Sequence, residues 1–412
     1  MNRSRSVYLL VAALACPSAG RASYDFTVVA SAPGGPFSAL SDTPPSLDED
    51  GKVAFLASAP QLAQPSIFVG TQLGQELVDY VQISGAPGQD PLSPFQIGSI
   101  VAGAVAFAAS GSGGEGVYYG AGGSLTTLYA PLPSSFYGPA VNFFGDFAFV
   151  ESGKLMLANA QGSSILLQKN DVVAGGTIFD VFNSATTPDI NDAGEVAFWA
   201  DIDFPSGPCD EAVMVLDSGG AGTVIALGAN EQCDWESAGG AIALSESGRV
   251  AYDAEIFDQT DFVNAAFVDQ TRVWDEHAPG FGASPQVQAI AVNDAGTPAL
   301  LVQSSSQTGV YTGADAVADK VLATGDSICG STVTEVGFHR FGFNDDGQLA
   351  LAVTLADSRR LVVRAEPRNG LPGGTCLPES GAGPATVAAV ATLAAVSRRQ
   401  ARRPAGRRAS LV

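Results

Sequence analysis

The chain has 412 residues, of which 46% are hydrophobic and only 15% are charged, with 48 Gly and 24 Pro. Abundant Gly with few charged residues argues against a helical bundle or coiled coil and favours short strands joined by turns. Because the chain is so apolar, we do not expect it to be disordered. No stretch of 18 strongly apolar residues is present, which excludes a polytopic membrane protein. The net charge of −22 predicts repulsion from phosphate backbones, so we expect no nucleic-acid partner.

Residues 1–22 predict a secretory signal peptide. Arg3 and Arg5 form a charged start, residues 7–15 (VYLLVAALA) form an apolar run, and small residues follow. Cleavage after Ala15, after Ala22 or nearby is consistent with this pattern. Cys16 leaves a lipoprotein open as an alternative, although Ala13 stands where such signals usually have Leu. We therefore expect an exported protein.

An eight-residue motif, written N-x-x-G-x-x-A-F, recurs through the middle of the chain. It is complete at 142–149 (NFFGDFAF) and 191–198 (NDAGEVAF). Related copies lie at 48–55 (DEDGKVAF), 100–107 (IVAGAVAF), 245–252 (SESGRVAY), 293–300 (NDAGTPAL) and 344–351 (NDDGQLAL). Their glycines fall at positions 51, 103, 145, 194, 248, 296 and 347. Seven copies in one phase indicate a repeat protein.

The motif has a local structural meaning. Asn or Asp opens a turn by bonding to backbone N–H groups, and Gly supplies the positive φ that the turn requires. The small Ala beside a large Phe suits a strand packed closely on both faces. Each repeat of about 50 residues then holds four short strands, the content of one propeller blade. We predict an all-β, seven-bladed β-propeller over residues 23–366, with the blade count open by one because the copy at 100–107 lacks the polar opener.

With these motifs, the chain resembles bacterial surface proteins built from tandem NxxGxxAF repeats, which carry a signal peptide and interchangeable C-terminal anchors. The resemblance covers nearly all of residues 24–366 and both ends of the chain. It implies display at the cell surface and no assigned reaction.

The C-terminal region predicts a sorting signal. Residues 367–384 form a Gly/Pro-rich linker, and residues 385–412 contain a short apolar run followed by six Arg. That run is too short to span a bilayer, and an Arg cluster holds a chain end on the cytoplasmic side. The linker contains a motif that resembles both the Pro-Glu-Pro and the sortase types, so the anchor class stays open: Leu377, Pro378, Glu379, Ser380 and Gly381. We expect a monomer that contacts the membrane only through this tail.

Four cysteines remain once the signal peptide is removed: Cys209, Cys233, Cys329 and Cys376. An even number of cysteines in an oxidising compartment suggests two disulfides. The economical pairing is 209–233 and 329–376, because the first two share a repeat and the third lies in the last one. Unpaired buried thiols are the alternative.

Acidic residues occupy equivalent motif turns, so a propeller would display them around one face: Asp48, Asp50, Asp192, Asp294, Asp345 and Asp346. Carboxylates are calcium ligands, but a protein site takes six to eight oxygens, and each turn offers only two or three. Turn formation is the preferred interpretation, and weak Ca²⁺ binding is the alternative. No other cofactor is predicted.

No residue pattern predicts catalysis. His277 and His339 lie in different repeats, and no Gly-x-Ser-x-Gly is present, so neither a serine hydrolase nor a zinc site is supported. We expect both histidines in loops or packing. The preferred function is a surface module that binds a protein or glycan. The alternatives are a structural envelope or matrix component, and a polysaccharide hydrolase or lyase with paired carboxylates facing the channel.

Overall fold

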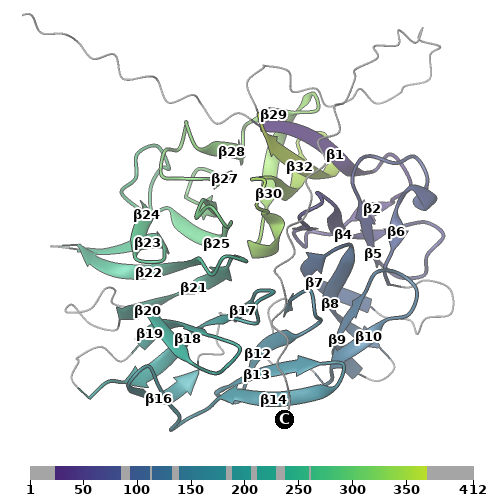
Figure 1. Ribbon diagram of the computed structural model, residues 1–412. Helices are drawn as coiled ribbons and strands as arrows, with labels where there is room; N and C mark the ends of the chain where they lie inside the picture. The colour runs from purple at the N-terminus through teal and green to yellow at the C-terminus, as the bar shows by residue number, and fades with distance from the viewer. Residues whose placement is uncertain are drawn as a thin grey trace, which may run out of the picture. The chain divides into compact units, whose positions relative to one another are not determined.

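The structure, a computed structural model, describes residues 24–84, 93–111, 114–131, 139–181, 188–205, 211–228, 237–258 and 261–368. These residues form seven antiparallel sheets arranged around a common axis (Figure 1). The prediction of an all-β, seven-bladed β-propeller is therefore confirmed. The predicted signal peptide and the predicted sorting tail lie outside the described residues.

Blades 1 to 3 follow one another along the chain. Blade 1 contains β2 (Ala39–Leu40), β3 (Ser46–Leu47), β4 (Val53–Ser58), β5 (Ser66–Gly70) and β6 (Val81–Gln82), with the 3₁₀ helix η1 (Leu77–Asp79) before β6. Blade 2 contains β7 (Ser93–Val101), β8 (Ala104–Gly111), β9 (Gly114–Gly120) and β10 (Thr126–Tyr129). Blade 3 contains β11 (Ala140–Val141), β12 (Phe147–Glu151), β13 (Lys154–Asn159) and β14 (Gly162–Leu167).

Blades 4 to 6 repeat the same order, with extra short strands in blade 4. Blade 4 contains β15 (Val172–Val173), β16 (Gly176–Val181), β17 (Asp189–Ile190), β18 (Val196–Asp203), β19 (Glu211–Leu216) and β20 (Gly222–Gly228). Blade 5 contains β21 (Ser237–Leu244), β22 (Val250–Asp258), β23 (Asp261–Val268) and β24 (Thr271–Asp275). Blade 6 contains β25 (Gln286–Val292), β26 (Pro298–Gln303), β27 (Thr308–Tyr311) and β28 (Lys320–Ala323).

Blade 7 is built from both ends of the described chain. Its members are β29 (Ser327–Ile328), β30 (Ser331–Gly337), β31 (Leu349–Leu355), β32 (Arg360–Pro367) and the N-terminal β1 (Tyr24–Ala32), with the 3₁₀ helix η2 (Arg340–Gly342) after β30. The first strand β1 pairs antiparallel with the last strand β32, from Tyr24 opposite Pro367 to Ala32 opposite Arg360 (Figure 1). This pairing closes the ring and covers a sheet edge that would otherwise be open.

The repeated motif forms the turn between the innermost strand of a blade and the next strand outward. In blade 4, the Asn191 side chain accepts the Glu195 N–H at 2.9 Å, and the Gly194 N–H donates to the Asn191 carbonyl at 3.0 Å. All seven motif glycines have φ between 76 and 84°, the left-handed region that favours Gly. Blade 2 differs because Ile100 has no side-chain acceptor, and there Ala102, with φ 51°, joins Gly103 in a tight hairpin between β7 and β8.

The last two residues of each motif pack against opposite neighbours. Ala106 lies in the core between blades 2 and 3, whereas Phe107 lies in the core between blades 1 and 2. Every motif Ala and every final Phe, Tyr or Leu is at most 1% exposed. Burial of one such large side chain contributes about 1.5–3 kcal/mol. The motif therefore holds adjacent blades together as well as forming a turn.

The described residues contain no helix long and apolar enough to cross a membrane.

Candidate functional site

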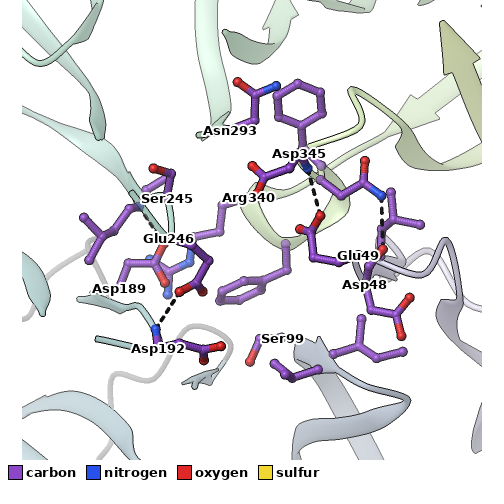
Figure 2. Close-up of a pocket in the computed structure, with 18 of the residues that line it drawn as sticks. Asp48, Glu49, Ser99, Asp189, Asp192, Ser245, Glu246, Asn293, Arg340 and Asp345 are labelled. Atoms are coloured by element: carbon purple, nitrogen blue, oxygen red, sulfur yellow. Dashed lines mark hydrogen bonds between the residues drawn. The ribbon is translucent and has the colours of Figure 1, made fainter. Parts of the chain in front are cut away.

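The motif turns surround one end of the central channel, which we call the channel mouth. There, residues from all seven blades line a cavity of about 340 Å³ (Figure 2). The cavity is lined by residues of the motif turns and by Arg340 and Phe341 of η2, which bounds it. The topology thus gathers seven copies of one turn around a single concavity.

Arg340 of η2 is one of the residues that line the mouth. Its guanidinium donates to the backbone carbonyls of Pro188, at 3.1 Å, and Ile242, at 3.2 Å, which belong to blades 4 and 5. Asp189, only 7% exposed, lies beside it and accepts the N–H groups of Ile190 and Leu244. Burial raises the pKa of Asp189, and the nearby Arg340 charge opposes that rise. This buried polar cluster ties blade 7 to two blades across the channel.

The second motif position supplies what we call the carboxylate ring: Glu49, Asp192, Glu246, Asp294 and Asp345. Each of these carboxylates accepts a backbone N–H from the motif turn of the preceding blade. The Asp345 N–H donates to Glu49 at 3.1 Å, and the Asp294 N–H donates to Asp345 at 2.7 Å. The Asp192 N–H donates to Glu246 at 2.7 Å (Figure 2). The ring therefore joins neighbouring turns, while its five residues remain exposed at the mouth.

Two members of the ring have unusual protonation equilibria. Partial loss of water in the concave mouth raises the pKa of both Glu49 and Glu246 to about 7. The N–H bonds to these carboxylates oppose the rise, and repulsion from Asp345 and Asp192, respectively, reinforces it. The charge of the mouth therefore changes near neutral pH.

Blade 3 places aromatic rings at the second and third motif positions, the first of which is acidic in five other blades. Phe143 and Phe144 follow its motif Asn and are 55% and 71% exposed. Their rings form an edge-to-face pair with centroids 5.7 Å apart, and Phe143 lines the mouth. Exposed aromatic side chains next to carboxylates provide an apolar contact at the rim.

The acidic residues considered as calcium ligands belong to this face, where several serve the turns. Asp48 is 4% exposed, and its carboxylate accepts the N–H groups of Asp50, Lys52 and Gly103. Asp50 pairs with Lys52 at 3.0 Å. Asp192, Asp294 and Asp345 belong to the carboxylate ring, and Asp346 is exposed beside it. Within the described ranges, no group of three or more His, Cys, Asp or Glu residues could hold a metal ion.

The two histidines lie on different blades. His339 precedes η2, and its Nδ1 accepts the Phe341 N–H at 3.1 Å while its Nε2 lies 3.5 Å from the Ser46 hydroxyl. Desolvation and the adjacent Arg340 charge lower the pKa of His339 to about 4, so the ring is neutral at pH 7. His277 follows β24, and its N–H donates to the Asp275 carboxylate.

Sequence reasoning did not single out Glu49, Glu246 or Arg340. Alignment of the motif copies could have found the two glutamates, because their position is acidic in five of seven copies. Arg340 carries no such signal, since among the described segments only blade 7 has a 3₁₀ helix between its inner strand and its motif.

Cys329 lies in the turn between β29 and β30 with φ 51°. Cys209, Cys233, Cys376 and the sorting motif 377–381 lie outside the described residues. The pairing of Cys329 with Cys376 therefore stays a prediction.

Comparison with known proteins reveals similarity of fold only. No family model and no curated protein matches the chain. A catalytically inactive virginiamycin B lyase from Staphylococcus aureus is similar at 13% identity and a TM-score of 0.41, covering 79% of this chain and 95% of that one. U3-55K is similar at 12% identity and a TM-score of 0.42, covering 83% and 98% of the two chains.

Proposed function

We propose that this protein is an exported, surface-anchored β-propeller that binds a ligand at the channel mouth. The observation that carries the proposal is the cavity of about 340 Å³ to which all seven blades contribute. Concave, pre-formed cavities of this size are the usual ligand sites of proteins. The η2 segment below the mouth bounds the cavity, so a ligand would be held at this end of the channel.

The chemistry of the mouth favours a ligand that presents a cationic group. Glu49, Glu246 and Asp192 offer exposed carboxylates, and Phe143 offers an apolar contact beside them. Arg340 also lines the mouth, but its guanidinium already donates to two carbonyls and lies beside Asp189. A Lys or Arg side chain of a protein partner and an amino sugar of a glycan both satisfy this requirement.

Peptide and glycan arrays probed with the mature protein test binding at this site. We expect hits enriched in cationic members and lost by the Glu49→Gln/Glu246→Gln double variant, since both substitutions remove mouth charge while preserving side-chain size. Hits that persist unchanged in the variant would contradict the mouth as the site. Absence of binding on both arrays would favour the structural role in the envelope or matrix.

Export and anchoring rest on the sequence patterns of residues 1–22 and 377–412. Protease accessibility on intact cells tests both. We expect full-length protein to be degraded from outside, and protein truncated before Leu377 to be released into the medium. Protection of the full-length chain inside intact cells would contradict export.

One observation favours an enzyme as a second candidate. A carboxylic acid that is half protonated near neutral pH can act as a general acid, and Glu49 and Glu246 have a pKa of about 7 in the same cavity. A polysaccharide hydrolase or lyase would release new chain ends from a substrate panel, and each single Gln variant would abolish that release. Release that survives in both variants would exclude these two residues as the catalytic pair.

A further inference from the structure

A second cavity, of about 300 Å³, lies on the other side of η2, and we call it the lower opening. Residues of β7, β21 and β25 line it, and the half-buried Ala241 and Ala289 are among its apolar members. His339 and Arg340 line it from above, and the Gln96 and Gln288 amides are at its edge. Most ligand cavities combine apolar walls with a few polar groups in this way.

The inner strands of several blades are bulged around this end of the channel. In β7 the extra residue is Phe95, between Pro94 and Gln96, and in β25 it is Gln288. In β16 the extra residue is Phe179, and in β30 it is Thr334. Bulges re-aim side chains and are over-represented beside functional sites. The bulges of β7 and β25 lie at the lower opening, because Gln96 and Gln288 line it.

Blade 5 has the largest of these irregularities. Between Ala238 and Ile242, β21 advances four residues while its partner strand advances two, so it contains two extra residues. The Asp253 carboxylate holds this bulge by accepting the Ala241 N–H at 2.6 Å. Burial raises the pKa of Asp253, which shows that placing this carboxylate there is costly.

The bulge leaves open space at the cavity. A Cβ on Gly239 would lie 2.2 Å from the Asp253 carbonyl oxygen, so only Gly fits there. At the next residue, Gly240, which lines the lower opening, an added Cβ would meet no atom of the described residues within 4 Å. The costly Asp253 contact therefore maintains an accessible hollow in the wall.

The charges around the cavity limit the class of ligand. No carboxylate and no lysine lines it among the described residues. Arg340 already donates to the carbonyls of Pro188 and Ile242, and the low pKa of His339 keeps its ring neutral. A cation would find no carboxylate in the described lining, and an anion would compete with Asp189, which lies beside Arg340, so neither would readily replace its lost hydration.

We propose that the lower opening is a second binding site, for an uncharged, largely apolar small molecule of roughly bicyclic size. The size follows because a cavity of about 150 Å³ accommodates benzene, and this cavity has about twice that volume. The proposal is independent of the ligand of the channel mouth, because η2 separates the two cavities.

Titration of the mature protein into 6-fluoroindole, followed by ¹⁹F NMR, tests this site. The probe is neutral, bicyclic and carries one N–H donor. We expect saturable line broadening with a Kd on the order of 0.1–1 mM, as suits a ligand of this size. Gly240→Leu should weaken binding at least about tenfold, because the new side chain occupies the hollow without a backbone clash.

The controls separate this site from other surfaces. Ala295→Leu adds apolar bulk to an exposed motif turn on the opposite face, and it should leave binding unchanged, as should Glu49→Gln/Glu246→Gln. If Gly240→Leu fails to fold, Ala289→Val at the same wall replaces it. The proposal is overturned if the wild type shows no saturable binding. It is equally overturned if the Gly240→Leu or Ala289→Val variant binds 6-fluoroindole as the wild type does. That result would indicate that the probe contacts exposed rings such as Phe257 and Phe262.

Discussion

The side-chain amide of Asn344 in blade 7 donates a hydrogen bond to the backbone carbonyl of Asp48 in blade 1, across 3.1 Å. The same bond joins Asn142 to the Asn191 carbonyl and Asn191 to the Ser245 carbonyl, each at 3.3 Å. The motif Asn therefore builds its own turn through Oδ1 and reaches the following blade through Nδ2. In Asn344 this second bond links the last motif to the first.

Replacement of Asn344 tests the cost of breaking this link. Asn344→Ala leaves the Gln348 N–H without its partner and removes the bond between blades to the Asp48 carbonyl, which then accepts only the Gly51 N–H of its own turn. We expect the free energy of unfolding to fall by about 1–3 kcal/mol. Asn344→Ser, which reproduces the residue found at Ser245, keeps an acceptor and should cost less. Urea denaturation measures both, and equal losses would show that the side chain does not act through its hydrogen bonds.

Arg340 should matter more for stability than a surface arginine. Arg340→Met leaves Asp189 and two buried carbonyls without their cation, so we expect a loss of about 3–5 kcal/mol. Arg272→Met, at an exposed ion pair with Asp258, is the matched control and should cost less than about 1 kcal/mol. Adding Asp189→Asn to Arg340→Met should recover part of the loss. A double variant as unstable as the sum of the two single variants would contradict direct coupling.

The carboxylate ring predicts a specific pH dependence. The pKa of Glu49 and Glu246 is about 7 in the folded protein, against 4.5 for an ordinary Glu. The folded state therefore binds more protons between these values, and the resulting stabilisation is present at low pH and is lost as the pH rises through 7. We expect the Tm of the Glu49→Gln/Glu246→Gln variant minus the Tm of the wild type to be more positive at pH 8 than at pH 5. His339 has the opposite effect on the pH dependence of stability, but it is present in both proteins, so its effect cancels in this comparison. An equal Tm difference at the two pH values would contradict the raised pKa of Glu49 and Glu246.

The fold followed from the sequence because each repeat carries its turn and packing residues in one short motif. Asn191 and Gly194 specify a turn whose geometry depends on neighbours two to four residues away, so their roles can be predicted locally. The pairing of β1 with β32 and the position of Arg340 depend on ring closure and on contacts across the channel. Such relationships between distant segments leave no periodic signal in a single sequence. The bulges around the lower opening likewise depend on strand register, which the motif does not determine.

The disulfide between Cys329 and Cys376 remains a prediction that peptide mapping can check. Closing the loop between Cys329 and Cys376 should stabilise the fold by roughly 4 kcal/mol in the entropic model. The bridge would restrict the unfolded chain around the last motif and strand β32. We expect non-reducing digests of exported protein to contain one peptide pair joined through these two residues. A Cys329 peptide joined to Cys209 or Cys233 would rule this pairing out.

The most direct test of ligand binding at the channel mouth is a calorimetric titration with hexalysine at pH 8 and low salt. Two double variants with the same change in net charge are compared: Glu49→Gln/Glu246→Gln at the mouth, and Glu115→Gln/Glu335→Gln at exposed positions elsewhere. We predict that the mouth variant raises the Kd at least about fivefold, as expected from the loss of two charge pairs, and that the other variant changes it less than about twofold. Equal weakening by the two variants would show that hexalysine responds only to the overall negative charge, and would contradict a binding site at the mouth.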